Sequence, residues 1–101
     1  MAFVKVCEMT DLKPGEALRF AASRPVALFK VDDHFYATDD TCTHAEASLS
    51  DGYIDDDVVE CPFHSARFCI RTGEVLSLPA SEPLKTYLVK IEDGSVFVEV
   101  G

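Results

Sequence analysis

Two short segments of similar content constrain this 101-residue chain more than any other feature. The first box is TCTHAEAS at 41–48 and the second box is ECPFHSAR at 60–67. They contain Cys42-x-His44 and, after sixteen intervening residues, Cys61-x2-His64. Cysteine thiolates and histidine imidazoles are common metal ligands. If these four side chains share one metal centre, the fold must bring two separate loops together.

Four interpretations of the two boxes are open. A structural zinc site usually takes like ligands in close pairs, whereas each box here is mixed. A Rieske-type [2Fe-2S] centre has two cysteines on one iron and two histidines on the other, so each loop can give a ligand to each iron. The other two interpretations are a set of residues that binds no metal and a cysteine nucleophile paired with histidine. The double spacing favours the Rieske-type cluster.

The rest of the chain is typical of strands. Its apolar and β-branched runs are short and lie between turn signals, and no window has a helical stripe of apolar residues. Hairpin turns are expected at 32–33, 71–73 and 93–95. We predict an all-β antiparallel sandwich or small barrel, one domain over 1–101, with each box on a loop carried by two strands. The predicted strands are 3–7, 25–31, 34–38, 57–61, 66–70, 74–78, 84–92 and 96–100.

The composition limits the partners and the compartment. Nine basic and eighteen acidic residues give a formal net charge of −9, which disfavours nucleic acid and anionic membranes and favours partners with basic patches. The acidic segments at 32–33, 39–40 and 55–57 are expected to be solvated turns or docking charges. No apolar run is long enough for a signal peptide or a membrane span, so a cytoplasmic protein is expected. Four cysteines in a reducing compartment favour metal ligation over disulfides.

The remaining cysteines and histidine are expected to have structural roles. Cys7 and Cys69 lie within apolar strand runs, where cysteine behaves as a small buried hydrophobe. His34 is expected at the surface of a hairpin. The chain has no Gly-x-Gly-x-x-Gly fingerprint for a flavin or nicotinamide, and His34 alone cannot form a two-histidine site for mononuclear iron. These absences favour an electron carrier over an enzyme.

The sequence resembles the Rieske ferredoxins of bacterial aromatic ring-hydroxylating dioxygenase systems, of the biphenyl and toluene dioxygenase type. The resemblance rests on the two boxes, DVVECPFHSARFCIRTGEV and LKTYLVKIEDG, and it covers essentially the whole chain. It implies a three-sheet Rieske fold with a two-loop cluster-binding subdomain at one tip, and a third, proline-bearing loop at 78–83. It also implies that Cys42 and Cys61 bind the inner iron, and that His44 and His64 bind the outer iron.

The resemblance further implies a place in a multicomponent system. Electrons would come from an NADH-dependent flavoprotein reductase and pass to the Rieske centre of a terminal oxygenase, which dihydroxylates an aromatic ring. The alternative is an accessory small subunit of a nitrite-reductase-like oxidoreductase. High-potential Rieske relatives carry two extra cysteines, where this chain has Ala47 and Phe63, and a serine where it has Ala66. A low-potential centre is therefore expected.

Overall fold

The computed structural model of the chain describes residues 2–42, 47–62, 66–77 and 82–100. The predictions for His44, His64 and Phe63 lie outside the described residues, as does the 78–81 part of the proline loop. Among the described residues, no helix has the length and apolar character needed to cross a membrane. The elements are β1 (Ala2–Glu8), η1 (Met9–Asp11), β2 (Ala17–Ala21), β3 (Pro25–Val31), β4 (His34–Asp39), η2 (Leu49–Asp51), β5 (Tyr53–Asp55), β6 (Val58–Glu60), β7 (Arg67–Cys69), β8 (Val75–Ser77), β9 (Thr86–Tyr87), β10 (Val89–Glu92) and β11 (Ser95–Val100), where η denotes a short 3-10 helix.

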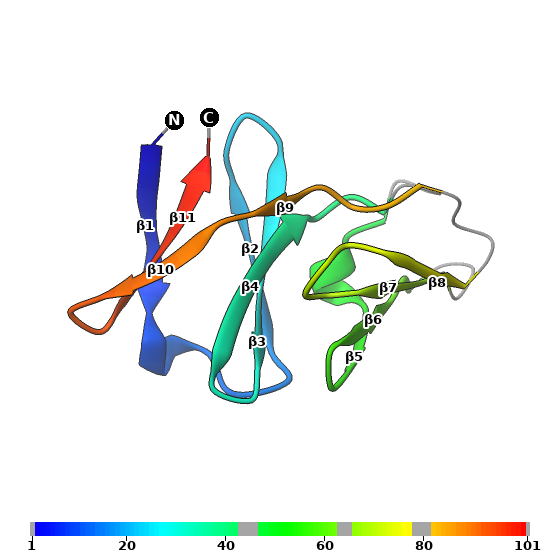
Figure 1. The fold of residues 1–101 in the computed structure, drawn as a ribbon, viewed down its shortest axis with the longest axis horizontal. Helices are drawn as coiled ribbons and strands as arrows, with labels where there is room; N and C mark the ends of the chain where they lie inside the picture. The colour runs from blue at the N-terminus through cyan, green and yellow to red at the C-terminus, as the bar shows by residue number, and fades with distance from the viewer. Residues whose placement is uncertain (1, 43–46, 63–65, 78–81, 101) are drawn as a thin grey trace.

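The strands form three antiparallel sheets that follow one another along the molecule (Figure 1). The terminal sheet has the order β1-β11-β10, the middle sheet β2-β3-β4-β9 and the distal sheet β5-β6-β7-β8. The two chain ends lie side by side, because β1 pairs with β11 from Ala2↔Val100 to Glu8↔Ser95. The predicted all-β, antiparallel, three-sheet architecture is therefore confirmed.

Strand β3 is buried on both faces, which explains why its sequence PVALFKV is apolar except for Lys30. Successive side chains of a strand point to opposite faces of the sheet. Val26 and Leu28 pack into a core with Val96 and Val98 of β11. The alternate residues pack into a second core, together with the inner face of the distal sheet: Ala27, Phe29, Val31, Val59, Phe68 and Ile70. The middle sheet thus separates two hydrophobic cores.

The distal sheet is an insertion in the middle sheet. Strands β4 and β9 are hydrogen-bonded neighbours, pairing Ala37 with Tyr87 and Thr38 with Thr86. The Asp39 amide also donates to the Lys85 carbonyl oxygen at 2.9 Å. Everything from residue 40 to 84, including both boxes, lies between these two strands in the sequence.

Several predicted strands differ from the observed ones. The run 84–92 is two strands, because the chain leaves the middle sheet after β9 and joins the terminal sheet as β10. The sequence also missed β2, whose two alanines have a low strand preference, and β5, which has three residues before an acidic turn. The predicted turn at Asp93-Gly94 is confirmed, and its φ values of 52° and 78° match the positive φ that a type I′ turn requires.

Candidate functional site

The two boxes are closed at their bases by the same backbone hydrogen bond. In the first box the Cys42 amide donates to the Ala47 carbonyl oxygen at 3.0 Å, and in the second the Cys61 amide donates to that of Ala66 at 2.7 Å. Each bond joins a cysteine to an alanine five positions later, and all four residues are buried. The two cysteines therefore occupy equivalent positions at the bases of the two boxes.

Different elements carry the two boxes. The second box spans the hairpin between β6 and β7, whose last pair is Glu60↔Arg67, so its predicted position is confirmed. The first box follows β4 as predicted, but the 3-10 helix η2 comes after it, and a single bridge, Thr41↔Ser48, joins its two ends. The prediction of two flanking strands was wrong for this box.

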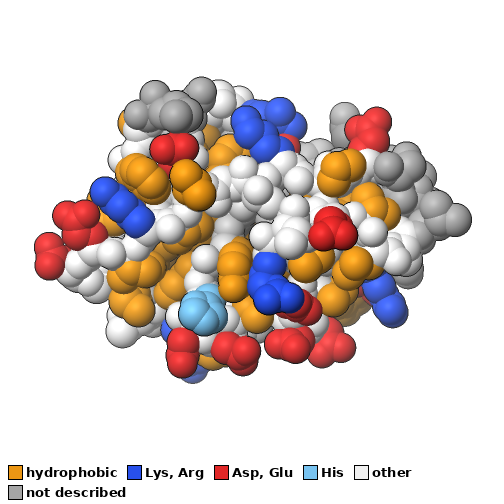
Figure 2. Space-filling view, viewed as in Figure 1, with side chains coloured by type: hydrophobic (Ala, Val, Ile, Leu, Met, Phe, Trp, Pro, Cys, Tyr) orange, Lys and Arg blue, Asp and Glu red, His pale blue; other side chains and the backbone are white. Residues whose placement is uncertain are grey.

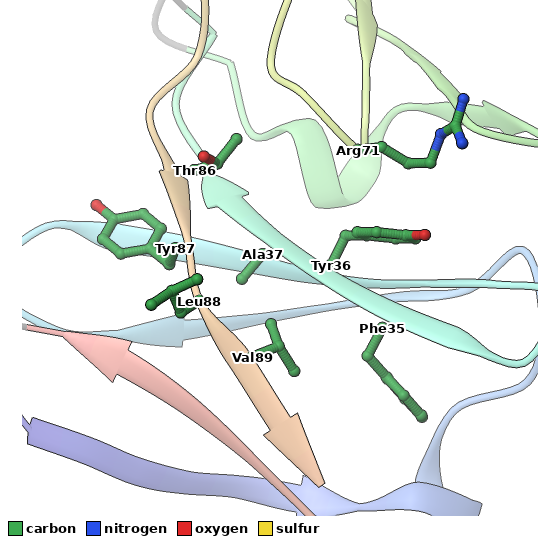
Figure 3. Close-up of a pocket in the computed structure, with 8 residues that line it drawn as sticks. All are labelled: Phe35, Tyr36, Ala37, Arg71, Thr86, Tyr87, Leu88 and Val89. Carbon is green, nitrogen blue, oxygen red and sulfur yellow. The ribbon is translucent and has the colours of Figure 1, made fainter.

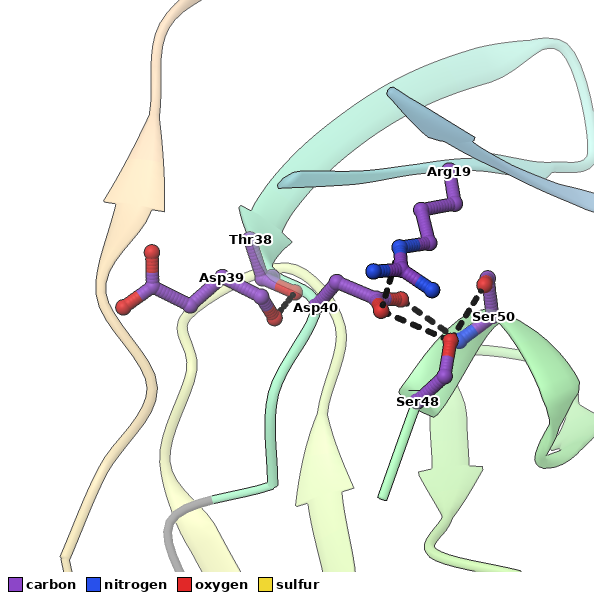
Figure 4. Close-up of polar contacts among 6 residues, drawn as sticks. All are labelled: Arg19, Thr38, Asp39, Asp40, Ser48 and Ser50. Carbon is purple, nitrogen blue, oxygen red and sulfur yellow. Dashed lines mark hydrogen bonds and ion pairs between the residues drawn. The ribbon is translucent and has the colours of Figure 1, made fainter. Parts of the chain in front are cut away.

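The buried Asp40 side chain explains why the chain turns into η2. One carboxylate oxygen of Asp40 accepts from the Ser48 hydroxyl at 2.6 Å, and the other accepts from the Ser50 amide at 2.9 Å (Figure 4). The Asp40 carbonyl oxygen also accepts from the Leu49 amide at 2.7 Å. These bonds use the polar groups of 48–50 locally, so this segment does not extend as a strand.

Asp39 points in the opposite direction from Asp40 (Figure 4). Its carboxylate accepts hydrogen bonds of 2.5 Å from the Arg24 guanidinium and from the Tyr87 hydroxyl. Partial burial of Tyr87, together with its hydrogen bond to Asp39, raises its pKa to about 12. Both carboxylates are buried, so the expectation that 39–40 is a solvated turn was wrong. The sequence signal that could have predicted this burial is the position of the two acids, between an apolar strand and the first box.

The donor chemistry of the described residues fits an iron-sulfur centre. Cys42 is 3% exposed and Cys61 is 1% exposed, and both belong to the core that lines the distal sheet. A thiolate in apolar surroundings is costly unless a cation compensates its charge. No disulfide joins any of the four cysteines. Two buried cysteines from two loops thus match the cysteine half of a Rieske donor set, and no set of three possible metal ligands occurs among the described residues alone.

The other cysteines and the described histidine lie outside the boxes, and Cys69 is the nearest of them, two residues after the second box on β7. Cys7 is buried in β1, and its pKa is raised by burial and by the nearby Asp11 and Glu8. Burial alone would raise the pKa of Cys69, but hydrogen bonds with Thr72 and the Arg71 backbone lower it overall.

His34 is exposed at the start of β4, with its ring centroid 6.3 Å from that of Tyr36. It is therefore at the surface, as predicted. The boxes follow the other end of β4.

An open groove of about 330 Å³ runs beside β4, β9 and β10 (Figure 3). The groove is lined by Phe35, Tyr36, Ala37, Arg71, Thr86, Tyr87, Leu88 and Val89. These eight residues include no cysteine, histidine or carboxylate, so they offer neither a nucleophile with its base nor a metal site. The groove gives no support to a catalytic function.

Acidic side chains gather along one edge of the surface (Figure 2). The turn after β3 and the turn after β5 line one depression there, which contains Asp32, Asp56 and Asp57. The Arg71 guanidinium lies 3.1 Å from the Asp57 carboxylate, and His34 is the other basic side chain in this lining. This edge therefore carries a net negative charge.

Comparison with known proteins identifies the family. The family model for the Rieske [2Fe-2S] domain matches residues 2–88. The biphenyl 2,3-dioxygenase ferredoxin component of Rhodococcus jostii strain RHA1 is 50% identical over 101 residues, covering 99% of this chain and 94% of the relative. The 3-phenylpropionate/cinnamic acid dioxygenase ferredoxin subunit of Escherichia coli K12 is 48% identical over 98 residues, covering 96% and 92%.

Solved structures agree in fold. The Sphingomonas yanoikuyae B1 ferredoxin has a TM-score of 0.93 and 37% identity, covering 99% of this chain and all of that one. A complex of reduced oxygenase and oxidized ferredoxin in carbazole 1,9a-dioxygenase contains a chain with a TM-score of 0.92 and 45% identity, covering 95% and 91%. A nitrite reductase small subunit from Mycobacterium tuberculosis, at 23% identity and a TM-score of 0.86, shares the fold alone. The chain therefore belongs to the Rieske [2Fe-2S] family, among the ferredoxins of aromatic dioxygenase systems, and its cofactor is a Rieske-type [2Fe-2S] cluster.

Proposed function

We propose that this chain is the ferredoxin of an aromatic-ring dioxygenase system, a one-electron carrier rather than an enzyme. The whole of 1–101 acts as one Rieske domain, with cluster loops at 41–48 and 60–67 and a third loop at 78–83. Cys42 and Cys61 bind one iron, and His44 and His64 bind the other. The observation that carries this proposal is the pair of buried cysteines, held by matching hydrogen bonds in two separate loops.

The described residues have clear roles in this function. When bound, the cluster supplies a one-electron couple at a potential suited to exchange with a flavin and with another Rieske centre. Leu49, Val59 and Phe68 are fully buried in the core that also contains Cys42 and Cys61, so they exclude water from the thiolates. The hairpin β6–β7 and the η2 turn fix the described ends of the two loops, and a fixed support of this kind reduces the movement needed at each electron transfer.

The partners of this carrier are an NADH-dependent flavoprotein reductase and a terminal oxygenase. The carbazole dioxygenase ferredoxin, which forms a complex with its oxygenase, supports the second partner. The formal charge of −9 favours docking surfaces with basic patches and fast, salt-sensitive association. A cytoplasmic location fits this role, because reducing conditions keep cysteines such as Cys7 and Cys69 as thiols.

Spectroscopy of the anaerobically purified protein tests the assignment. We expect the visible absorption of an iron-sulfur protein and, after dithionite reduction, the electron paramagnetic resonance spectrum of a Rieske centre. Replacing any one of Cys42, His44, Cys61 or His64 with alanine should abolish both signals. Colourless protein with bound zinc would refute the proposal.

Three variants serve as matched controls for the ligand substitutions. Cys7→Ser, Cys69→Ser and His34→Ala change the same residue types outside the boxes, and each should keep the Rieske spectrum. Loss of the spectrum in His34→Ala would overturn the ligand assignment. In a reductase-coupled assay, the wild-type protein should support electron flow from NADH to a dioxygenase of this class, and failure with every such oxygenase would favour the nitrite-reductase alternative.

A further inference from the structure

We propose that Asp40 positions the first cluster loop and that its buried negative charge lowers the midpoint potential of the cluster. The proposal rests on the proposed function, because it requires that Cys42 be a ligand. It concerns a residue that does not itself bind the metal.

The positioning role follows from the contacts of Asp40. Its carboxylate joins Ser48, the last residue of the first box, and Ser50 of η2 to the end of β4 (Figure 4). The Asp40 amide donates to the Pro25 carbonyl oxygen at 3.0 Å, which fixes the same residue to β3. Both ends of the first box are therefore tied to Asp40: Cys42 is two residues further along the chain, and Ser48 is bound through its hydroxyl.

The second box does not need a side chain like Asp40 to hold its two ends together. Its two ends are adjacent strands of one hairpin, with three cross-strand pairs between β6 and β7. The first box has one bridge and lies between a strand of the middle sheet and a 3-10 helix. Hydrogen bonds to a charged acceptor are stronger than bonds between neutral groups. In the first box, the hydrogen bonds of Asp40 hold the two ends together in place of the cross-strand hydrogen bonds that hold the second box.

The electrostatic role follows from the burial of Asp40. Its side chain is 2% exposed, and among the described residues its one cationic neighbour is Arg19, whose Nε lies 3.5 Å away and whose side chain is 59% exposed. Solvent screens the guanidinium more than it screens the buried carboxylate, so the pair leaves a net negative field toward the interior. Reduction adds a negative charge to the cluster. A buried anion two residues from a ligand opposes that addition and lowers the potential.

Asp40→Asn separates charge from geometry. The asparagine has the same shape, and its oxygen can accept from the Ser50 amide. The Ser48 and Ser50 hydroxyl oxygens lie 2.8 Å apart, so the Ser48 hydroxyl can donate to Ser50 instead of to residue 40. The Ser48 oxygen can then accept from the NH₂ group of the asparagine. Asp40→Ala removes both the charge and the contacts. Asp33→Asn is the matched control, since Asp33 is an exposed acid in the turn between β3 and β4.

The first measurement is the midpoint potential, obtained by redox titration of the visible circular dichroism of the holoprotein. At a potential equal to the wild-type midpoint, the Asp40→Asn variant should contain at least three times as much reduced as oxidised cluster. For a one-electron couple, this ratio corresponds to a shift in midpoint potential of about +28 mV. Asp33→Asn should change the ratio less. Equal shifts in the two variants would overturn the electrostatic role. An absent Rieske spectrum in the wild-type protein would instead refute the proposed function.

The second measurement is the rate at which the cluster is lost on warming, followed by visible absorption. Asp40→Ala should lose it at least ten-fold faster than wild type, while Asp40→Asn should restore a rate within about three-fold of wild type. If Asp40→Ala does not fold, Ser48→Ala replaces it and should lose the cluster several-fold faster. If the alanine variant that is measured loses its cluster at the wild-type rate, the positioning role is overturned.

Discussion

Gly73 offers a sharp test of how the distal sheet is joined to the segment that returns to the middle sheet. It lies in the turn between β7 and β8 with φ of +79°. Its amide donates to the Cys69 carbonyl oxygen, and its carbonyl accepts from the Leu84 amide, each at 2.8 Å. A Cβ added at this position would lie 2.3 Å from the Leu84 carbonyl oxygen. The substitution Gly73→Ala therefore combines backbone strain with a backbone clash.

The two costs can be estimated separately. An L-residue in the left-handed region costs about 1–2 kcal/mol. The clash involves the backbone of Leu84, which is buried in the core of the distal sheet, so relieving it should resemble overpacking and cost about 1–3 kcal/mol. The expected loss in the free energy of unfolding is about 2–5 kcal/mol. Gly94→Ala is the matched control, because Gly94 has φ of +78° and nothing within 4 Å of an added Cβ. Its expected loss is about 1–2 kcal/mol.

Urea unfolding of the holoprotein, followed by far-ultraviolet circular dichroism and by the visible signal of the cluster, measures this difference. Gly73→Ala should be the less stable variant by at least about 1 kcal/mol, without a change in the dependence of the free energy on urea. Equal free energies for the two variants, within about 0.5 kcal/mol, would show that the Leu84 segment moves without cost. That result would refute the reasoning that Gly73 is required to fix this segment.

Three further predictions concern the redox centre and the titrating groups. The midpoint potential should lie near the negative end of the roughly −150 to +300 mV range of Rieske centres and be nearly independent of pH around neutrality. Ala66→Ser should raise the midpoint potential by providing a hydroxyl donor. Protein-film voltammetry from about pH 6 to 9 measures both, and a wild-type midpoint well above zero would disprove the expectation. Because the folded pKa of Tyr87 is raised from 10.0 to about 12, its contribution to stability is fully present below pH 10 and is lost as the pH rises through 12. Tyr87→Phe should therefore weaken the loss of stability between about pH 10 and 12, and an unchanged loss would count against this role. The lowered pKa of Cys69 and the raised pKa of Cys7 predict faster iodoacetamide labelling of Cys69 in the holoprotein, measured by peptide mass spectrometry, and a faster Cys7 would contradict it.

The sequence predicted the parts of the fold that depend on local patterns. Strand β3 is apolar except for Lys30, and the turn at Asp93-Gly94 is a strong hairpin signal, so both were predicted. Strand β2 was missed because its position is determined by pairing with β3, from Ala17↔Phe29 to Ala21↔Pro25, and not by its own residues. Arg19 of this strand faces Asp40, a contact between residues that no local pattern connects.

The candidate site was predicted in part. Cys42 and Cys61 were identified from spacing alone, and the structure places both in one buried core. The ligand assignments of Cys42, Cys61, His44 and His64 all stay predictions, and the two histidines also lie outside the described residues. Asp39 and Asp40 were taken for surface acids, because aspartate is usually exposed and its burial depends on partners that are distant in sequence.

The pairing of β4 with β9 has a consequence for the protein without its cluster. The pair Thr38↔Thr86 closes a loop of 47 residues, 39–85, at an entropic cost of about 3 kcal/mol. Contacts within that loop must offset this cost, and the proposed metal binding to Cys42 and Cys61 would be one of them. When the metal leaves, β9 is the strand that separates most readily, since it has two residues. Its departure would expose the hydrogen-bonding edge of β4 beside Phe35 and Ala37, and such an edge is a template for pairing with another chain. Cluster loss should therefore make the protein prone to aggregate through β4.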